Sequence, residues 1–377
     1  MAFKKRYNGS SKISNLFWDN SSDYFGRSDT LFKTMVPHNI LVRMPNWIGD
    51  LVMATPILSD LRKAFPSAII TAMCRRPLCE LLEQDEAIDE LFCFAKPSNQ
   101  FLRREQRDIV AKIGAGKYDL GILLTNSFSS AWWFFQGNVD RRIGYAAHFR
   151  RFLLTDPVLP SKEKMHQIDF YKKLLGPLGI PHSKTAPRLF VSAKEVEESK
   201  QLLTQRGYIR GAPLVGINPG AAYGTAKCWP PDRFRALAED LLRDEDLFLV
   251  FFGDLTHLDL IKAICQGLPK RVINLAGVTR LRELACLIQD LDLLITNDSG
   301  PMHIGAAFGV ALVALFGSTD ARETGPYGQS EAVIDKRVSC SPCFKKVCPI
   351  DFRCMTRITV EEVATQARAC LKRRIPK

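Results

Sequence analysis

Two series of short apolar runs constrain the fold of this 377-residue chain more than any other feature. In both series the runs alternate with segments that carry apolar residues at helical spacing. Such alternation predicts parallel strands joined by crossover helices. The expected strands are 39–44, 68–74, 90–95, 119–125 and 141–145, then 214–218, 247–252, 272–276, 292–297 and 310–316. The sequence therefore predicts an α/β protein with two doubly wound, Rossmann-like domains.

The break between the two series sets the expected domain boundaries. Helices are predicted near 49–64, 104–115, 128–136, 164–178, 194–206, 231–242, 257–267, 281–289, 301–308 and 358–374. We expect an N-terminal extension over 1–37, a first domain over 38–190, a second domain over 191–355 and a C-terminal helix over 356–377. The chain length suits about two to three domains.

A carboxylate stands just beyond the first expected strand. Asp50 closes the segment RMPNWIGD (43–50), which joins the apolar run 39–42 to a helical pattern. Ligands of open α/β sheets bind beyond the carboxyl ends of the strands. Asp50 is therefore our candidate for a catalytic base. The alternative is an acidic residue that only complements the positive end of a helix.

A second polar turn occurs in the second series. The apolar run 293–295 passes into Thr-Asn-Asp-Ser (296–299), a helix opens at Gly300, and another apolar strand ends at Gly317. This pattern predicts a βαβ unit with a polar turn at its ligand edge. Asp298 either caps this helix or contacts a ligand, and the two roles are compatible.

A small-residue turn follows the first strand of the second series. Asn-Pro-Gly-Ala (218–221) is followed by Lys227, just before a Trp-Pro pair and a helix. Exposed backbone N–H groups and a nearby ammonium are the features that a diphosphate needs. Ordinary loop chemistry remains the alternative for this turn.

In order and spacing over residues 39–355, these motifs resemble glycosyltransferase family 9, the lipopolysaccharide heptosyltransferases. The resemblance implies the glycosyltransferase B fold, with two Rossmann-like domains facing across a cleft and a terminal helix that packs back on the first domain. It implies inverting transfer of L-glycero-D-manno-heptose from ADP-heptose to the lipopolysaccharide inner core, with Asp50 as the base. The donor-binding residues that it implies are Gly220, Ala221, Thr225, Lys227, Asp298, Ser299 and Gly300.

The acceptor is expected at the first domain. It would be a glycolipid of the Kdo-lipid A type, whose carboxylates and phosphates suit guanidinium groups. The candidate residues are Asn46, Trp47, Arg141, Arg142, Arg150 and Arg151. Two alternatives remain open: another family 9 transferase with a different donor or acceptor, and a non-catalytic protein that binds nucleotide sugars or glycolipids.

The net charge of +12 favours an anionic partner. No nucleic-acid-binding motif accompanies the basic residues, so an anionic membrane surface is the better candidate, and a merely solvated surface is the alternative. The sequence carries neither a secretory signal nor an apolar run of membrane-spanning length. We therefore expect a cytoplasmic protein that binds peripherally to the inner face of the bacterial inner membrane.

Eleven cysteines, an odd number without an export signal, are expected to be reduced. Cys340, Cys343, Cys348 and Cys354 form a short-spaced cluster that is either packed thiols or a structural metal or disulfide site. The resemblance associates such a stretch, together with Pro-Asn-Trp (45–47), with addition of the second heptose. We expect no catalytic metal and no cofactor, because Lys227 and a helix N-terminus would stabilise the departing ADP.

Overall fold

The computed structural model describes residues 36–95, 102–244 and 246–373. Residues 37–377 form one compact unit that contains two six-stranded parallel sheets. The extension expected over 1–37 lies almost wholly outside the described residues. In the described part of the chain, no helix is long and apolar enough to span a membrane.

The first sheet has the strand order β3-β2-β1-β4-β5-β6. Its strands are β1 (Asn39–Arg43), β2 (Ile69–Arg75), β3 (Glu90–Phe94), β4 (Leu120–Leu123), β5 (Arg141–Tyr145) and β6 (Asp156–Val158). The accompanying helices are α1 (Ile48–Ala64), α2 (Leu102–Ala115), α3 (Phe128–Gln136) and α4 (Gln167–Lys172). Val42 of β1 lies opposite Ala72 of β2 and Ile122 of β4. All three residues are fully buried, which explains why these strands read as unbroken apolar runs.

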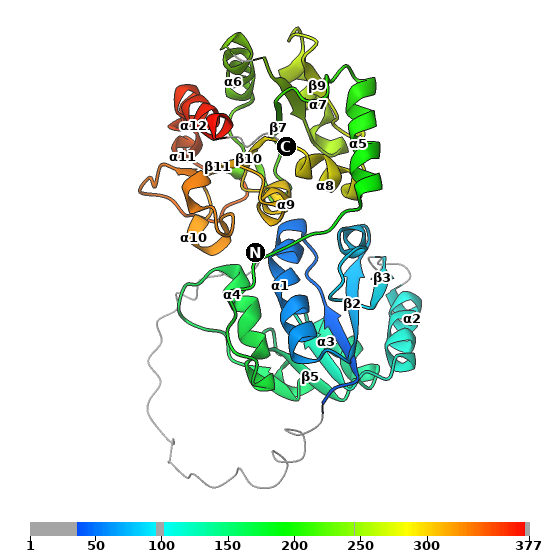
Figure 1. Cartoon of the computed structure of the whole chain (residues 1–377). Coiled ribbons are helices and arrows are strands. Elements are labelled where there is room, and N and C mark those ends of the chain that lie inside the picture. Colours follow the sequence, from blue (N-terminus) through cyan, green and yellow to red (C-terminus); the bar gives the residue numbers. More distant parts are fainter. Residues whose placement is uncertain (1–35, 96–101, 245, 374–377) are drawn as a thin grey trace, which may run out of the picture. The chain divides into compact units, whose positions relative to one another are not determined.

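The second sheet has the order β12-β11-β10-β7-β8-β9. Its strands are β7 (Leu214–Asn218), β8 (Phe248–Phe251), β9 (Val272–Asn274), β10 (Leu293–Asn297), β11 (Leu312–Phe316) and β12 (Val333–Asp335). The helices of this half, shown in Figure 1, are α5 (Ala193–Gln205), α6 (Pro231–Asp244), α7 (Leu258–Cys265), α8 (Leu281–Gln289), α9 (Gly300–Phe308), α10 (Ala321–Thr324), α11 (Arg353–Thr356) and α12 (Val360–Lys372).

Both sheets have the same doubly wound topology. In each, the third, second and first strands lie side by side, and the order reverses between the first strand and the fourth. Ligands of such sheets bind beyond the carboxyl ends of the strands at this point of reversal. The predicted α/β class with two doubly wound halves is confirmed. The points of reversal are β1/β4 and β7/β10.

The terminal helix differs from the expectation. α12 packs against α6, β10 and β11, all in the second half of the chain. Val363, Ala364 and Ala367 are buried in the core of that half. The expectation that this helix packs back on the first domain was wrong, because its apolar face completes the second core.

The N-termini of α1 and α9 lie in close contact, although α1 follows the first sheet's leading strand and α9 belongs to the second. A Cβ atom added at Gly49 would lie 2.6 Å from the His303 ring, and one at Gly300 would lie 2.8 Å from Cβ of Ile48. Glycine is required at both positions for this approach. The contact brings the two candidate ligand edges together.

One pair of cysteines also differs from the expectation. Cys79 and Cys93 form a disulfide, whereas both were expected to be reduced. The other nine cysteines are free thiols.

Candidate active site

Asp50 lies in the first turn of α1, directly after the carboxyl end of β1. Its side chain is half-buried. Burial raises its pKa above the usual value of 3.8, and the nearby carboxylate of Asp298 acts in the same direction. The ammonium of Lys227 and a hydrogen bond from Tyr171 oppose this rise by favouring the charged form. A carboxylate with a raised pKa is suited to accept a proton from a hydroxyl group.

Tyr171, on α4, is the hydrogen-bond partner of Asp50. The tyrosine is buried, and burial raises the pKa of its phenol well above 10. The phenol therefore stays protonated and donates a hydrogen bond to the carboxylate of Asp50. This hydrogen bond orients the proposed base.

Lys227 and Asp298 form a buried ion pair in the second half. The Lys227 ammonium lies 2.5 Å from Oδ2 of Asp298, and the two side chains are 6% and 4% exposed. The hydroxyl of Thr319 donates to the same carboxylate oxygen at 2.6 Å. The Lys227 ammonium also lies 5.0 Å from the centre of the Tyr223 ring. These contacts hold the lysine at the carboxyl edge of the second sheet.

Two buried asparagines join the turn after β7 to the turn after β10. The Asn218 amide donates to the Ser299 hydroxyl at 3.0 Å and to the Gly220 carbonyl at 3.1 Å. The Asn297 amide donates to the Pro219 carbonyl at 2.7 Å. Its oxygen accepts the backbone N–H of Trp229 at 3.0 Å. The two predicted donor-binding turns are therefore one hydrogen-bonded unit.

The structure brings the predicted donor residues to this edge. Gly220 and Ala221 are buried, whereas Thr225 is exposed at the start of the 3₁₀ turn that carries Lys227. Ser299 is the N-cap residue of α9 but makes no side-chain cap, and Gly300 begins the helix. Asp298 does not cap the helix: Ser299 holds the N-cap position, and the Asp298 carboxylate accepts from Lys227 and Thr319.

His303 also belongs to the site. Its ring packs against Gly49 and is buried, and burial lowers its pKa to about 4. Asp298 raises this pKa, whereas His166 and Lys227 lower it further. The ring is therefore neutral at physiological pH.

Asn46 and Trp47 lie at the mouth of the first sheet, beside Asp50. Asn46 is exposed and its amide oxygen accepts from the Arg43 guanidinium at 2.7 Å. Arg43 is buried and lies 4.7 Å from the centre of the Phe94 ring. Trp47 is 55% exposed. Both candidate acceptor residues are thus accessible.

The four candidate arginines divide into structural and exposed groups. Arg141 pairs with Asp156 at 2.7 Å, and Arg142 donates to the carbonyl of Leu153 at 2.8 Å. Arg150 is fully buried, and its guanidinium donates to the carbonyls of Tyr145, Thr125 and Ser127 and to the Asn126 side chain. Arg151 is exposed. Three of the four therefore hold the backbone of the first domain, so they do not form one open patch with Arg151.

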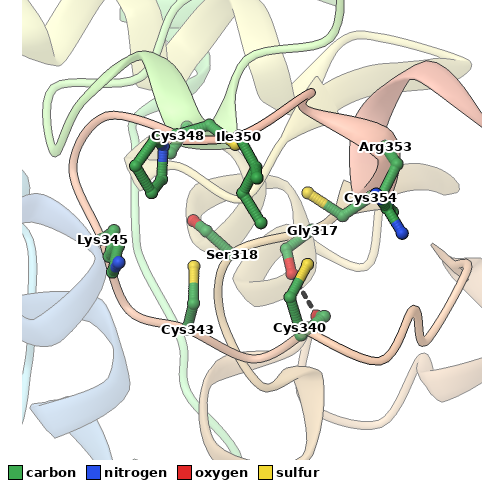
Figure 2. A pocket seen from close by; sticks show the side chains of 12 residues that line it. Gly317, Ser318, Cys340, Cys343, Lys345, Cys348, Ile350, Arg353 and Cys354 are labelled. Carbon is green, nitrogen blue, oxygen red and sulfur yellow. Dashed lines mark hydrogen bonds between the residues drawn. The ribbon is translucent and has the colours of Figure 1, made fainter.

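Three cysteines of the cluster lie in the loop between β12 and α11, and the fourth, Cys354, lies on α11. Cys340, Cys343, Cys348 and Cys354 line a cavity of about 70 Å³ (Figure 2). Burial raises the pKa of Cys354 to about 11, and the other three thiols add to the rise. Among the described residues, no three His, Cys, Asp or Glu side chains are placed to hold a metal ion.

The loop between β12 and α11, which we call the cysteine loop, contacts the segment between β7 and α6 directly. The carbonyl of Lys346 accepts the N–H of Ala226 at 2.9 Å, and the hydroxyl of Tyr223 donates to the carbonyl of Phe344 at 2.9 Å. A Cβ atom at Gly224, whose φ is +153°, would lie 2.3 Å from the Lys346 carbonyl oxygen. The segment that carries Lys227 is thus packed against this loop.

Sequence reasoning missed several residues of the site. Tyr171 lies in a short helix with no motif around it, and His303 lies inside an apolar helix, where a histidine is ordinarily a core residue. His303 is indeed buried, but it also contacts the helix that carries Asp50. For Asn218 and Asn297 the available signal was their position at strand ends.

The chain belongs to glycosyltransferase family 9 (heptosyltransferase), whose match covers residues 107–352. It is 30% identical to lipooligosaccharide heptosyltransferase 2 of Haemophilus influenzae over 313 residues, which cover 78% of this chain and 88% of the relative. It is 31% identical to lipopolysaccharide heptosyltransferase 2 of Escherichia coli, over 78% of this chain and 87% of that protein.

A solved structure agrees with this assignment and confirms the predicted glycosyltransferase B architecture. The structure of E. coli ADP-heptose lps heptosyltransferase II superimposes with a TM-score of 0.76 and 27% identity, over 89% of this chain and 98% of that one. The protein is therefore a glycosyltransferase.

Proposed function

We propose that this enzyme transfers L-glycero-D-manno-heptose from ADP-heptose to the inner core of lipopolysaccharide, with inversion, and that it adds the second heptose. The observation that carries the proposal is the convergence of Asp50 with Lys227 and Asp298, which come from opposite halves of the chain. The names of the relatives support the donor and the position of transfer.

The chemistry follows from the positions of these groups. Asp50 would take the proton of the acceptor hydroxyl as that oxygen attacks the anomeric carbon. Lys227 would stabilise the negative charge that develops on the departing ADP, together with backbone N–H groups at the start of α9. Asp298 would contact the donor sugar and hold Lys227. The protein needs no metal ion for these roles.

The acceptor in this proposal is a Kdo-lipid A-type glycolipid, held at the cytoplasmic surface of the inner membrane. Asn46 and Trp47 would contact its sugars, because both lie exposed next to Asp50. Of the four candidate arginines, Arg151 is the one exposed to an anionic acceptor, while Arg141, Arg142 and Arg150 would act through the backbone that they hold.

The test is transfer from ADP-heptose to defined truncated core acceptors, in excess EDTA, with the product mass as the readout. We expect one heptose to be added to the acceptor that already carries one. Transfer only to an acceptor without heptose, or from another nucleotide sugar, would identify a different family 9 activity. Loss of activity that magnesium or manganese restores would contradict the metal-free mechanism.

The first variant to test is Asp50→Asn. It should bind ADP-heptose as the wild type does but lower turnover by about a hundredfold or more, because general-base assistance contributes about 10²–10⁴. Asp140→Asn removes an exposed carboxylate of the same half and is the matched control. Near-normal turnover in Asp50→Asn would remove this residue from the mechanism.

A further inference from the structure

A group of exposed aromatic rings lies on α3 and on the segment that follows β5. Three ring contacts connect Phe128, Trp132, Phe135 and Phe152, with centroid distances of 5.8–6.4 Å. These four side chains are 38–71% exposed, and Phe149 nearby in the chain is 95% exposed. We call these five residues the aromatic rim. Clustered apolar exposure of this kind marks an interaction surface rather than ordinary solvent-facing residues.

The topology places Phe128, Phe149 and Phe152 at the same sheet edge as Asp50, and α3 carries Trp132 and Phe135 away from that edge. Phe128 begins α3 shortly after β4 ends, and Phe149 and Phe152 follow the end of β5. β4 pairs in parallel with β1 on one side and with β5 on the other. Their carboxyl ends therefore lie at one edge, which is the edge that carries the proposed base. Leu159, 71% exposed, follows β6 at this edge as well.

The loop that exposes Phe149 has an unfavourable backbone conformation. His148 and Phe149 have φ values of +50° and +57°, a region that residues other than glycine rarely adopt. The buried Arg150 guanidinium joins this loop to the turn between β4 and α3 through the carbonyls of Tyr145 and Thr125. The buried Arg150 and the positive φ angles of His148 and Phe149 thus fix a loop conformation in which the Phe149 side chain is exposed.

Positive charge accompanies the rings. Arg151 is exposed and lies between Phe149 and Phe152 in the chain. The Arg142 guanidinium, which donates to backbone carbonyls, lies 5.5 Å from the centre of the Phe135 ring and supports that ring. Exposed aromatic rings beside an exposed arginine suit the interface of a membrane that contains anionic lipid, where rings enter the apolar layer and the cation meets the headgroups. The net charge of +12 favours the same partner.

We propose that the aromatic rim docks on a membrane that contains anionic lipid, with Phe149 and Phe152 inserted below the headgroups. The inference deepens the proposed function and rests on it for the acceptor: a glycolipid held in that membrane presents its sugars to the edge where Asp50 lies.

The experiment compares wild-type protein with Phe149→Ser/Phe152→Ser. Binding is measured by co-sedimentation with phosphatidylcholine vesicles that contain or lack phosphatidylglycerol. We expect the wild type to bind the anionic vesicles, and the variant to bind them at least about tenfold more weakly, because two large apolar side chains no longer leave water. The matched control is Ile209→Ser/Leu255→Ser, which removes two residues that are 67% and 74% exposed elsewhere. It should bind as the wild type does.

Activity assays separate this proposal from the proposed function. On a deacylated, soluble acceptor the rim variant should transfer as fast as the wild type, and on acceptor embedded in vesicles it should be slower. If neither the wild type nor the variant transferred heptose to either acceptor, the proposed function would be refuted. The vesicle-binding result would then decide by itself whether the aromatic rim docks on a membrane. Equal vesicle binding by wild type and variant, or a wild-type dimer that the variant abolishes without any change in vesicle binding, would overturn the docking proposal.

Discussion

At the scale of single residues, the site depends on side chains whose partners are distant in the sequence. Asp50 could be identified from its position after the first strand, and Lys227 and Asp298 from their turns. Tyr171 could not, because its role arises only when α4 packs beside α1. The same is true of the arginines: the sequence indicates a cation at position 150, but only the fold shows that its guanidinium is enclosed by backbone carbonyls.

The hydrogen bond from Tyr171 gives a prediction about pH. The rate of transfer should increase with pH as Asp50 loses its proton, which gives an acid limb in the pH profile. The midpoint of this limb should lie above the ordinary pKa range of an aspartate, because burial raises the pKa of Asp50. The hydrogen bond stabilises the charged carboxylate, so its loss raises the pKa further. Tyr171→Phe should therefore shift the limb upward by about one pH unit, the equivalent of a lost hydrogen bond to a charged group.

The readout is kcat/KM as a function of pH. Tyr208→Phe is the control, since it also removes a buried phenol hydroxyl, one that donates to the Ala212 carbonyl at 2.8 Å. Both variants should lose some stability, but only Tyr171→Phe should move the limb. A limb that stays in place in Tyr171→Phe would show that this phenol does not govern the proton affinity of Asp50.

At the scale of elements, the apolar runs predicted ten strands, and the structure contains all of them. It adds β6 and β12, two edge strands of three residues each. Strands this short have no readable periodicity, and β6 includes Pro157, which ordinarily argues against a strand. The position of α12 was wrong for a different reason: an amphipathic helix shows which face is apolar but not which core receives it.

The cysteine loop yields a prediction of its own. Because this loop accepts hydrogen bonds from Ala226 and Tyr223, loosening it should weaken the donor site without touching the base. Cys343→Ser/Cys348→Ser should raise the Kd for ADP by about threefold to tenfold, the loss expected for weakened hydrogen bonds worth about 0.5–1.5 kcal/mol. Turnover at saturating donor should remain close to that of the wild type.

The control for this loop is Cys265→Ser/Cys370→Ser, which changes two free cysteines on α7 and α12. Thiol titration and metal analysis of the purified wild type will test whether the four cysteines of the cluster are free thiols, as they are in the structure. ADP binding that is equal in the two double variants would show that the cysteine loop does not control the donor site.

At the scale of the whole molecule, the two halves contribute different parts of the site. Donor binding to the second half should therefore be measurable in a variant that lacks the base of the first half. ADP should raise the Tm of the wild type and of Asp50→Asn alike, because binding to the folded state stabilises it. In Lys227→Met/Asp298→Asn this rise should be smaller, since the phosphates lose their ammonium partner. Changing both members of the pair avoids leaving a buried carboxylate alone, which would cost about 3–5 kcal/mol. An unchanged rise in the double variant would contradict the assignment of the phosphate site.

The contact between Gly49 and His303 has a consequence for the empty enzyme. It holds two helix N-termini against each other, and each behaves as roughly half a positive charge. Ends of like polarity repel; the carboxylates of Asp50 and Asp298 offset part of this repulsion, and an anion between the ends would offset more of it. A diphosphate is then a counterion for both halves at once. The departing product would be held more firmly than its own contacts suggest, and added salt, by screening the two helix ends, would ease its release.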